Sequence, residues 1–234
     1  MKELNYYFKN IESFTEKEIF ENTKFVWEPL SKLDNYLKEK IVDKDIKINK
    51  GTTEEFCSIQ GNYFIDENTN IGANTTIIGP VIIGKNVTIM PGTLIRSGTI
   101  IGDNVVIGHG SEIKHSIIQN NAKIQSFTFC GDSIIGKSTR IGSGTILANR
   151  RFDQKDIEIK IQNEKYNTGL NFFGAIVGDN SRIGANCTTS PGTCIGPYTY
   201  IFPGVKVWEF IEEQKRVIPE KEYRITENEK IELD

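Results

Sequence analysis

The residues best suited to acid–base and anion chemistry gather in one stretch of this sequence. Its only two histidines, His109 and His115, lie six residues apart, and the cations Arg96 and Lys114 are eighteen residues apart. Histidine can take up a proton near neutral pH, which is the task of a general base. Two cations held side by side can clamp a phosphate. Whether these side chains meet depends on the fold that carries them.

The central part of the chain has a six-residue repeat. Isoleucine occupies every sixth position from Ile65 to Ile113, and Asn or Gly recurs at fixed places between these isoleucines. A strand has a period of two and a helix a period of 3.6, whereas a strict period of six is typical of a hexapeptide β-helix. We therefore expect an all-β fold in which three hexads make one triangular coil, with the isoleucines inside and Asn or Gly at the corners. Arg96 and Lys114 would then stack one coil apart, at about 4.8 Å.

The repeat is short in its middle. Ile113 and Ile135 are 22 residues apart, two fewer than four hexads require, so we expect an irregular coil around Ser126. Irregular backbone on a rigid scaffold often carries a site, although simple slippage of the repeat would give the same spacing. His109 precedes Ser126 by 17 residues, which should place it almost directly beneath Ser126.

Three further segments flank or interrupt the repeat, which we assign to residues 51–207. Residues 1–50 are helical in pattern, with Pro29 suited to a first helical turn and an apolar stripe of Val26, Leu30, Leu33, Leu37 and Ile41. This stripe is either a docking arm for a partner or a cap on its own domain, and we prefer the cap. A hairpin loop should project at about residues 150–173, and residues 208–234 should cap the open end of the last coil.

Composition excludes several classes of function. With 28 basic and 31 acidic residues the net charge is −3, which argues against a nucleic-acid groove or a basic membrane-binding face. No apolar run reaches the roughly 20 residues that span a bilayer, and the N-terminus lacks the pattern of a secretory signal. The four scattered cysteines and two histidines do not have the spacing of a metal site. We expect reduced thiols, no metal and a cytoplasmic location.

A set of motifs within the hexads is more specific than the repeat. In order these are Arg96-Ser97-Gly98, Gly108-His109-Gly110-Ser111-Glu112-Ile113-Lys114, Phe129-Cys130-Gly131-Asp132, Gly142-Ser143-Gly144-Thr145 and Asn149. Their spacing resembles the acetyltransferase domain of bifunctional sugar-1-phosphate nucleotidylyltransferase/glucosamine-1-phosphate acetyltransferases. The run from Ala148 to Asp153 is most similar to the archaeal-type members. The resemblance covers roughly residues 70–207, and we expect no counterpart of that family's nucleotidylyltransferase domain.

The resemblance implies a left-handed parallel β-helix, a homotrimer with sites between neighbouring prisms, acetyl-CoA as donor and an amino-sugar phosphate as acceptor. It places Arg96 and Lys114 on the sugar phosphate and Asn149 near the reacting amine, although Asn149 also suits a corner of the repeat. Phe129 stands where the family has tyrosine, and Arg150 where its bacterial members have tyrosine. We assign Ala185 and Pro203 to the binding of CoA.

The family's catalytic histidine is replaced in this chain. Counting three residues back from Phe129 gives Ser126, and serine is not a base at neutral pH without help. We predict that His109 takes the proton, directly, through Ser126 or through a water, although an exposed turn histidine is the plainer interpretation. His115 lies on the next face and is the weaker candidate.

These residues favour an acyltransferase that N-acetylates an amino-sugar phosphate, such as glucosamine 1-phosphate, or a related nucleotide sugar. The alternative is a catalytically silent trimer that binds a sugar phosphate and partners a separate nucleotidylyltransferase through residues 1–50. A zinc enzyme of the carbonic-anhydrase type on the same scaffold would need three histidines around the metal, and the chain has two.

Overall fold

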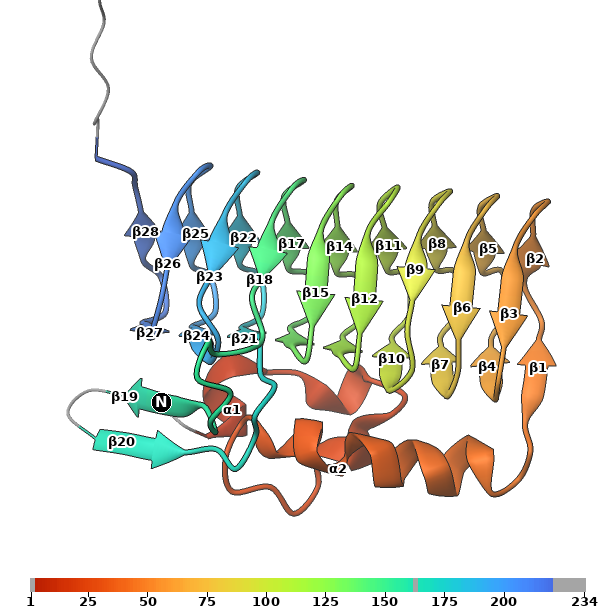
Figure 1. Cartoon of the computed structure of the whole chain (residues 1–234), viewed down its shortest axis with the longest axis horizontal. Helices are drawn as coiled ribbons and strands as arrows, with labels where there is room; N and C mark the ends of the chain where they lie inside the picture. Colours follow the sequence, from red (N-terminus) through yellow and green to blue (C-terminus); the bar gives the residue numbers. More distant parts are fainter. Residues whose placement is uncertain (1–2, 162–163, 221–234) are drawn as a thin grey trace, which may run out of the picture.

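The computed structural model describes residues 3–161 and 164–220. Three parallel sheets wind into a β-solenoid, and each sheet forms one wall of a long prism (Figure 1). Within each wall, the inner strands pair in parallel with strands from the coils before and after them. The structure therefore confirms the parallel β-helix predicted from the hexads.

The three walls are named sheets A, B and C, and their strands follow one another around the prism. Sheet A contains β1 (Lys47–Asn49), β4 (Tyr63–Ile65), β7 (Val81–Ile83), β10 (Thr99–Ile101), β13 (Ile117–Ile118), β16 (Ile134–Ile135), β21 (Ala175–Val177), β24 (Thr193–Ile195) and β27 (Phe210–Ile211). Sheet B contains β2 (Thr52–Thr53), β5 (Asn70–Ile71), β8 (Thr88–Ile89), β11 (Val106–Ile107), β14 (Lys123–Ile124), β17 (Arg140–Ile141), β22 (Arg182–Ile183), β25 (Tyr200–Ile201) and β28 (Arg216–Val217). Sheet C contains β3 (Ser58–Gln60), β6 (Thr76–Ile78), β9 (Leu94–Ile95), β12 (Glu112–Lys114), β15 (Phe129–Gly131), β18 (Ile146–Leu147), β23 (Thr188–Thr189) and β26 (Lys206–Val207).

The prism is filled mainly by the repeated aliphatic side chain of each hexad, and residues such as Val87, Val105 and Ala122 add to the same core. The nine isoleucines from Ile65 to Ile113 are all buried, and each stacks on its counterpart in the next coil. Asparagines take the left-handed backbone conformation at the corners, as at Asn68 with φ 59° and Asn104 with φ 57°. Asparagine tolerates this region better than most residues do, so these corners turn sharply at little cost.

The two missing residues are not at Ser126, which corrects the expectation from the sequence. Ser126 lies in a full hexad between Ile124 and Cys130. The shortened steps run from Ile113 to Ile118 and from Cys130 to Ile135, and both lie where sheet C passes into sheet A. Two successive coils therefore have 17 residues, and the backbone irregularity falls at the corners that carry His115 and Asp132.

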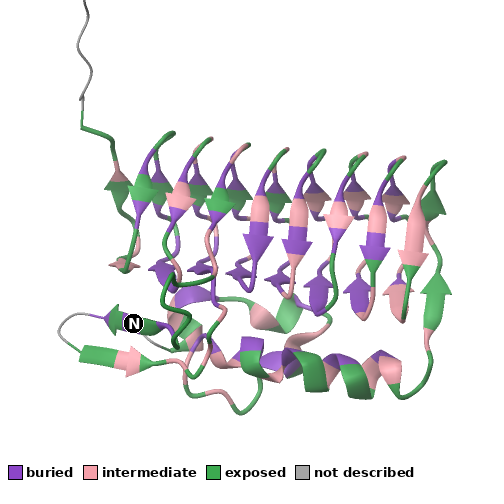
Figure 2. Cartoon of the chain, viewed as in Figure 1, coloured by how far each residue is buried: buried purple, intermediate pink, exposed green. Residues whose placement is uncertain are grey.

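The N-terminal helical segment covers sheet A. It consists of α1 (Leu4–Tyr7), the 3-10 turns η1 (Ile11–Ser13) and η2 (Lys17–Phe20), α2 (Glu28–Leu37) and the π turn η3 (Lys38–Val42). The apolar stripe of α2 is buried in one cluster with the outward isoleucines of sheet A, such as Ile100, Ile117 and Ile134. Figure 2 shows this buried face of α2 against the prism and an exposed face on its other side. The stripe is thus a cap on its own domain and is not free to dock a partner.

The segments outside the regular coil differ in detail from the predicted boundaries. The coil already begins with β1, which pairs with β4. The projecting hairpin is formed by β19 (Glu158–Ile161) and β20 (Glu164–Asn167), which pair antiparallel. Within the segment expected to form a cap, β27 and β28 add a further coil, and residues 221–234 lie outside the described residues. Among the described helices, none has both the length and the apolar character required to cross a bilayer.

Candidate functional site

A buried carboxylate organises the corner between sheets C and A, here called the C–A edge. The side chain of Asp132 is 5% exposed. Its Oδ2 accepts hydrogen bonds from Lys114 Nζ at 3.0 Å and from Asn149 Nδ2 at 2.6 Å. Lys114 and Asn149 were both predicted from the sequence to contact the acceptor substrate, and the structure brings them together on this single carboxylate.

His115 is the third group against Asp132. Its Nδ1 is 3.1 Å from Asp132 Oδ1, but the approach is not aligned as a hydrogen bond, so this contact is a close electrostatic one. Its Nε2 is 3.5 Å from Asp34 Oδ1 on α2. The imidazole therefore lies between two carboxylates and links the helical segment to the coil.

The charge of Asp132 is maintained by these neighbours. Burial alone would raise the pKa of Asp132, but the contacts from His115, Asn149 and Lys114 outweigh it and hold the pKa below its ordinary value. Lys114 is therefore positioned by a carboxylate that stays ionised across the neutral range.

The projecting loop supplies an aromatic ring to the same edge. The backbone N–H of Phe173 donates to the Asn149 carbonyl at 2.8 Å, which closes the base of the loop. The ring of Phe172 lies 4.3 Å from Lys114 Nζ and 4.6 Å from the guanidinium carbon of Arg150. Two cations thus share one ring beside Asp132, an arrangement that suits an anionic ligand.

Arg96 follows β9 one coil below Lys114, as the spacing predicted, because Ile95 pairs with Ile113. Its Nη1 donates to Glu112 Oε1 at 2.9 Å. Each cation of the predicted clamp therefore has a carboxylate partner, Glu112 for Arg96 and Asp132 for Lys114. A bound phosphate would compete with these carboxylates for the two cations.

His109 lies at the opposite corner, where sheet B passes into sheet C, here called the B–C edge. The His109 side chain is exposed, and its Nδ1 is 2.6 Å from the carbonyl oxygen of Pro91. A carbonyl can only accept, so in the neutral imidazole Nδ1 carries the proton and Nε2 has the free lone pair. Among the described residues, Nε2 has no hydrogen-bond partner. The ring of Phe127 stands edge-on to the imidazole, with the centroids 5.1 Å apart.

The register places His109 one coil beneath Ser126, as predicted. The flanking pairs Ile107–Ile124 and Ile113–Cys130 are both 17 residues apart, and Phe127 N donates to His109 O at 2.8 Å. Both residues are within the described part of the chain, and their side chains form no hydrogen bond with each other.

Ala185 and Pro203 lie further along the same B–C edge. They occupy matching corners of neighbouring coils, because Ile183 pairs with Ile201 and Gly204 N donates to Ala185 O at 2.9 Å. Both side chains are short, so they leave space at these two corners for an extended ligand. The two residues assigned to CoA are therefore collinear with His109 and Ser126.

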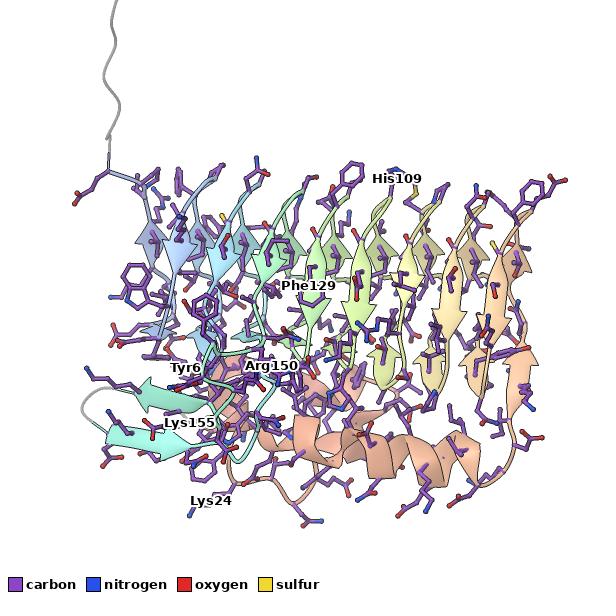
Figure 3. The ribbon with its side chains drawn as sticks, in the orientation of Figure 1. Tyr6, Lys24, His109, Phe129, Arg150 and Lys155 are labelled. Carbon is purple, nitrogen blue, oxygen red and sulfur yellow. The ribbon has the colours of Figure 1, made fainter. Side chains whose placement is uncertain are left out.

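The structure separates the predicted site residues into two groups. Figure 3 shows His109 at one edge of sheet C, Phe129 on the sheet between, and Arg150 near the opposite edge. Lys114 is five positions after His109 in the chain, so their Cα atoms are up to about 16 Å apart. A ligand that touches both edges must lie across the outer face of sheet C.

Sequence reasoning missed the importance of Asp132 and undervalued His115. The available signal was the pair of five-residue steps, each of which encloses one of these residues. The described residues hold no group of three or more histidine, cysteine or acidic side chains that could bind a metal.

Comparisons with known proteins agree with this scaffold. The model of the GMPPB C-terminal domain matches residues 77–164, and that of the hexapeptide repeat of succinyl-transferase matches residues 174–197. The bifunctional sugar-1-phosphate nucleotidylyltransferase/acetyltransferase of Sulfurisphaera tokodaii is 37% identical over 159 residues, which are 68% of this chain and 40% of that protein. The bifunctional protein GlmU of Methanococcus maripaludis is 36% identical over 200 residues, which are 86% of this chain and 47% of that protein.

A third relative matches over most of its own length. The putative uncharacterized acetyltransferase YaiX of Escherichia coli is 33% identical over 175 residues, which are 75% of each chain. This chain spans less than half of the two bifunctional relatives. The solenoid and these matches together define a hexapeptide-repeat protein of the transferase class. The chain belongs to the hexapeptide-repeat acyltransferase family.

Proposed function

We propose that this protein transfers an acetyl group from acetyl-CoA to the amine of an amino-sugar phosphate or of a nucleotide-linked amino sugar. The observation that carries the proposal is the hydrogen bond from His109 Nδ1 to the Pro91 carbonyl. It fixes the neutral tautomer with Nε2 as proton acceptor, which is what a base for an ammonium group requires. Ser126 then need not be the base, although it occupies the family's histidine position.

The reaction can be written with its protons balanced. His109 Nε2 takes a proton from the acceptor ammonium, and the amine attacks the thioester carbonyl. The C–S bond breaks and an amide C–N bond forms, and the nitrogen loses a second proton as it becomes the amide. Of the two protons that leave the nitrogen, one reaches the CoA thiolate from the imidazolium and the other passes to water. Histidine is thus regenerated as the neutral base.

The acceptor is proposed to lie across sheet C. Its amine points to the B–C edge and its phosphate to Lys114 and Arg96 at the C–A edge. Asn149 and Asp132 hold Lys114 in place, and Phe129 forms the floor between the two edges. The separation of those edges favours an acceptor longer than a monosaccharide phosphate, or a site completed by a neighbouring copy. We propose a homotrimer for that reason.

Turnover tests this proposal. The wild-type protein is incubated with acetyl-CoA and a panel of amino-sugar phosphates and nucleotide-linked amino sugars, and free thiol is followed with a chromogenic disulfide. We expect thiol release that depends on one class of acceptor, with an N-acetylated product identified by mass spectrometry. A protein that binds CoA but releases no thiol above the acceptor-free rate with any member of the panel would be a silent binder.

A further inference from the structure

The outer face of sheet B carries a row of cations in consecutive coils. Lys123 pairs in register with Arg140, and Arg140 with Arg182. Arg182 pairs with Tyr200, and Tyr200 with Arg216. All five side chains are exposed, and neighbouring rungs are about 4.8 Å apart. These five residues are here called the cationic ladder.

This ladder is unusual in an acidic protein. The chain has three more acidic than basic residues, yet every outward position in the strands of sheet B is neutral or basic. Within the described part of the chain, no ion pair joins a ladder cation to a carboxylate. Like charges on neighbouring strands repel one another, so the row weakens the fold unless something anionic binds it.

The side-chain contacts on the ladder do not neutralise it. Arg140 reaches the amide oxygen of Gln125 at 3.4 Å, and Arg182 donates to the backbone carbonyls of Ser138 and Ser181. All of these acceptors are uncharged. Tyr200 adds an exposed aromatic ring between two arginine rungs, and a ring with flanking arginines is suited to a nucleotide base and its phosphates.

The ladder runs beside the B–C edge described above. Lys123 is three residues before Ser126 in its coil, Arg182 three before Ala185, and Tyr200 three before Pro203. A ligand laid along the edge from His109 towards Pro203 therefore has the ladder at its flank over its whole length. The far rungs lie about 14–24 Å along the axis from the coil of His109.

We infer that the cationic ladder binds the adenosine 3′-phosphate 5′-diphosphate end of acyl-CoA, with the base on Tyr200 and the phosphates on the arginines. The inference rests on the proposed function, which supplies the donor. Of the substrates in that reaction, the donor alone combines an adenine, a diphosphate and a separate 3′-phosphate on one extended chain. A diphosphate-linked acceptor is the competing occupant.

Equilibrium binding to the full chain tests the inference. Isothermal titration calorimetry compares wild type, Arg140→Gln and Arg216→Gln with CoA, dephospho-CoA and UDP as probes, at low and high salt. Lys160→Gln on the exposed hairpin strand β19 is the matched control, because it removes the same charge away from sheet B. We expect each ladder substitution to weaken CoA about tenfold, as for the loss of a charge-assisted hydrogen bond, and the control to leave it unchanged. Dephospho-CoA should bind more weakly than CoA to wild type.

Thermal unfolding gives a second readout. Because Arg140 has only a weak neutral contact, Arg140→Gln should keep or raise Tm while it weakens binding. A lowered Tm would mark Arg140 as a structural residue and overturn its assignment. CoA affinity within twofold of wild type in both ladder variants would overturn the inference, as would an effect on UDP and none on CoA.

The two proposals fail separately. If wild type turns over acetyl-CoA and the ladder variants bind CoA normally, the ladder assignment is wrong and the acyl transfer stands. If CoA binding depends on the ladder and no acceptor is acetylated, the ladder assignment stands and the acyl transfer is wrong.

Discussion

Replacing Asp132 by Asn should destabilise the protein strongly. The carboxylate is almost fully buried and takes hydrogen bonds from Lys114 and Asn149 and a close contact from His115. Breaking a buried pair by removal of one partner costs about 3–5 kcal/mol, and the partial exposure of Lys114 places this case near about 3 kcal/mol. For a chain of this size, that corresponds to a fall in Tm of about 6–12 °C.

The sign of the pH dependence follows from the pKa of Asp132. This pKa is lower in the folded protein than in the unfolded chain, so the stabilisation is present above the unfolded value of about 3.9. It is lost as the pH falls through the folded pKa. The difference in Tm between wild type and Asp132→Asn should therefore be constant near neutral pH and should shrink once the pH falls below about 4.

Differential scanning fluorimetry from pH 3 to pH 8 provides the assay. Asp45→Asn is the matched control, because Asp45 also pairs with a lysine, Lys47, at 2.9 Å, but with both side chains exposed, Asp45 at 77% and Lys47 at 52%. Surface pairs are worth at most about 1 kcal/mol, so the control should lose at most about 4 °C. If Asp132→Asn loses no more than the control, Asp132 does not organise the C–A edge as described.

Four further predictions address other parts of the molecule. Leu33→Ala should lower the free energy of unfolding by about 2–5 kcal/mol, because Leu33 is fully buried where α2 packs on sheet A. The loss is measured as a lowered Tm, and an unchanged Tm would mean that the helical cap is not packed as described. Arg96→Ala should weaken binding of an amino-sugar phosphate about tenfold by calorimetry, whereas Glu112→Gln should tighten it, and the same sign for both would contradict the clamp. Ser126→His should keep or raise the rate of thiol release, and a large loss would show that Ser126 itself acts in catalysis. Multi-angle light scattering should give the mass of a trimer, and a monomer at micromolar concentration would argue against a composite site.

The coil was predictable because its cause is local and repeated. Each buried isoleucine needs only its counterparts six residues away in the chain and one coil away in space, so the period alone indicated the fold. The corner asparagines followed from the same logic, since a left-handed turn selects asparagine or glycine at a fixed place. The apolar stripe on α2 could be recognised for the same reason. The sequence left open whether it packs on its own domain or docks a partner, and the structure places it against sheet A.

The site was only partly predictable because its residues meet across long gaps in the chain. Asn149 reaches Asp132 because the backbone leaves the coil as the projecting loop and returns at Phe173, which a linear spacing does not reveal. The missing residues were counted correctly, but the count does not tell which corner loses them. The two shortened corners are those of His115 and Asp132, where side chains pack around one buried carboxylate. That packing is visible only in the three-dimensional structure.

The central claim is that His109 is the base of an acetyl transfer. The most direct measurement is the steady-state rate of CoA release from acetyl-CoA with a productive acceptor, for wild type and His109→Ala, with CoA affinity measured in parallel. We predict that the rate falls by about 10²–10⁴ and that CoA affinity barely changes, because the imidazole acts on the acceptor amine. An unchanged rate in an active enzyme would contradict the account.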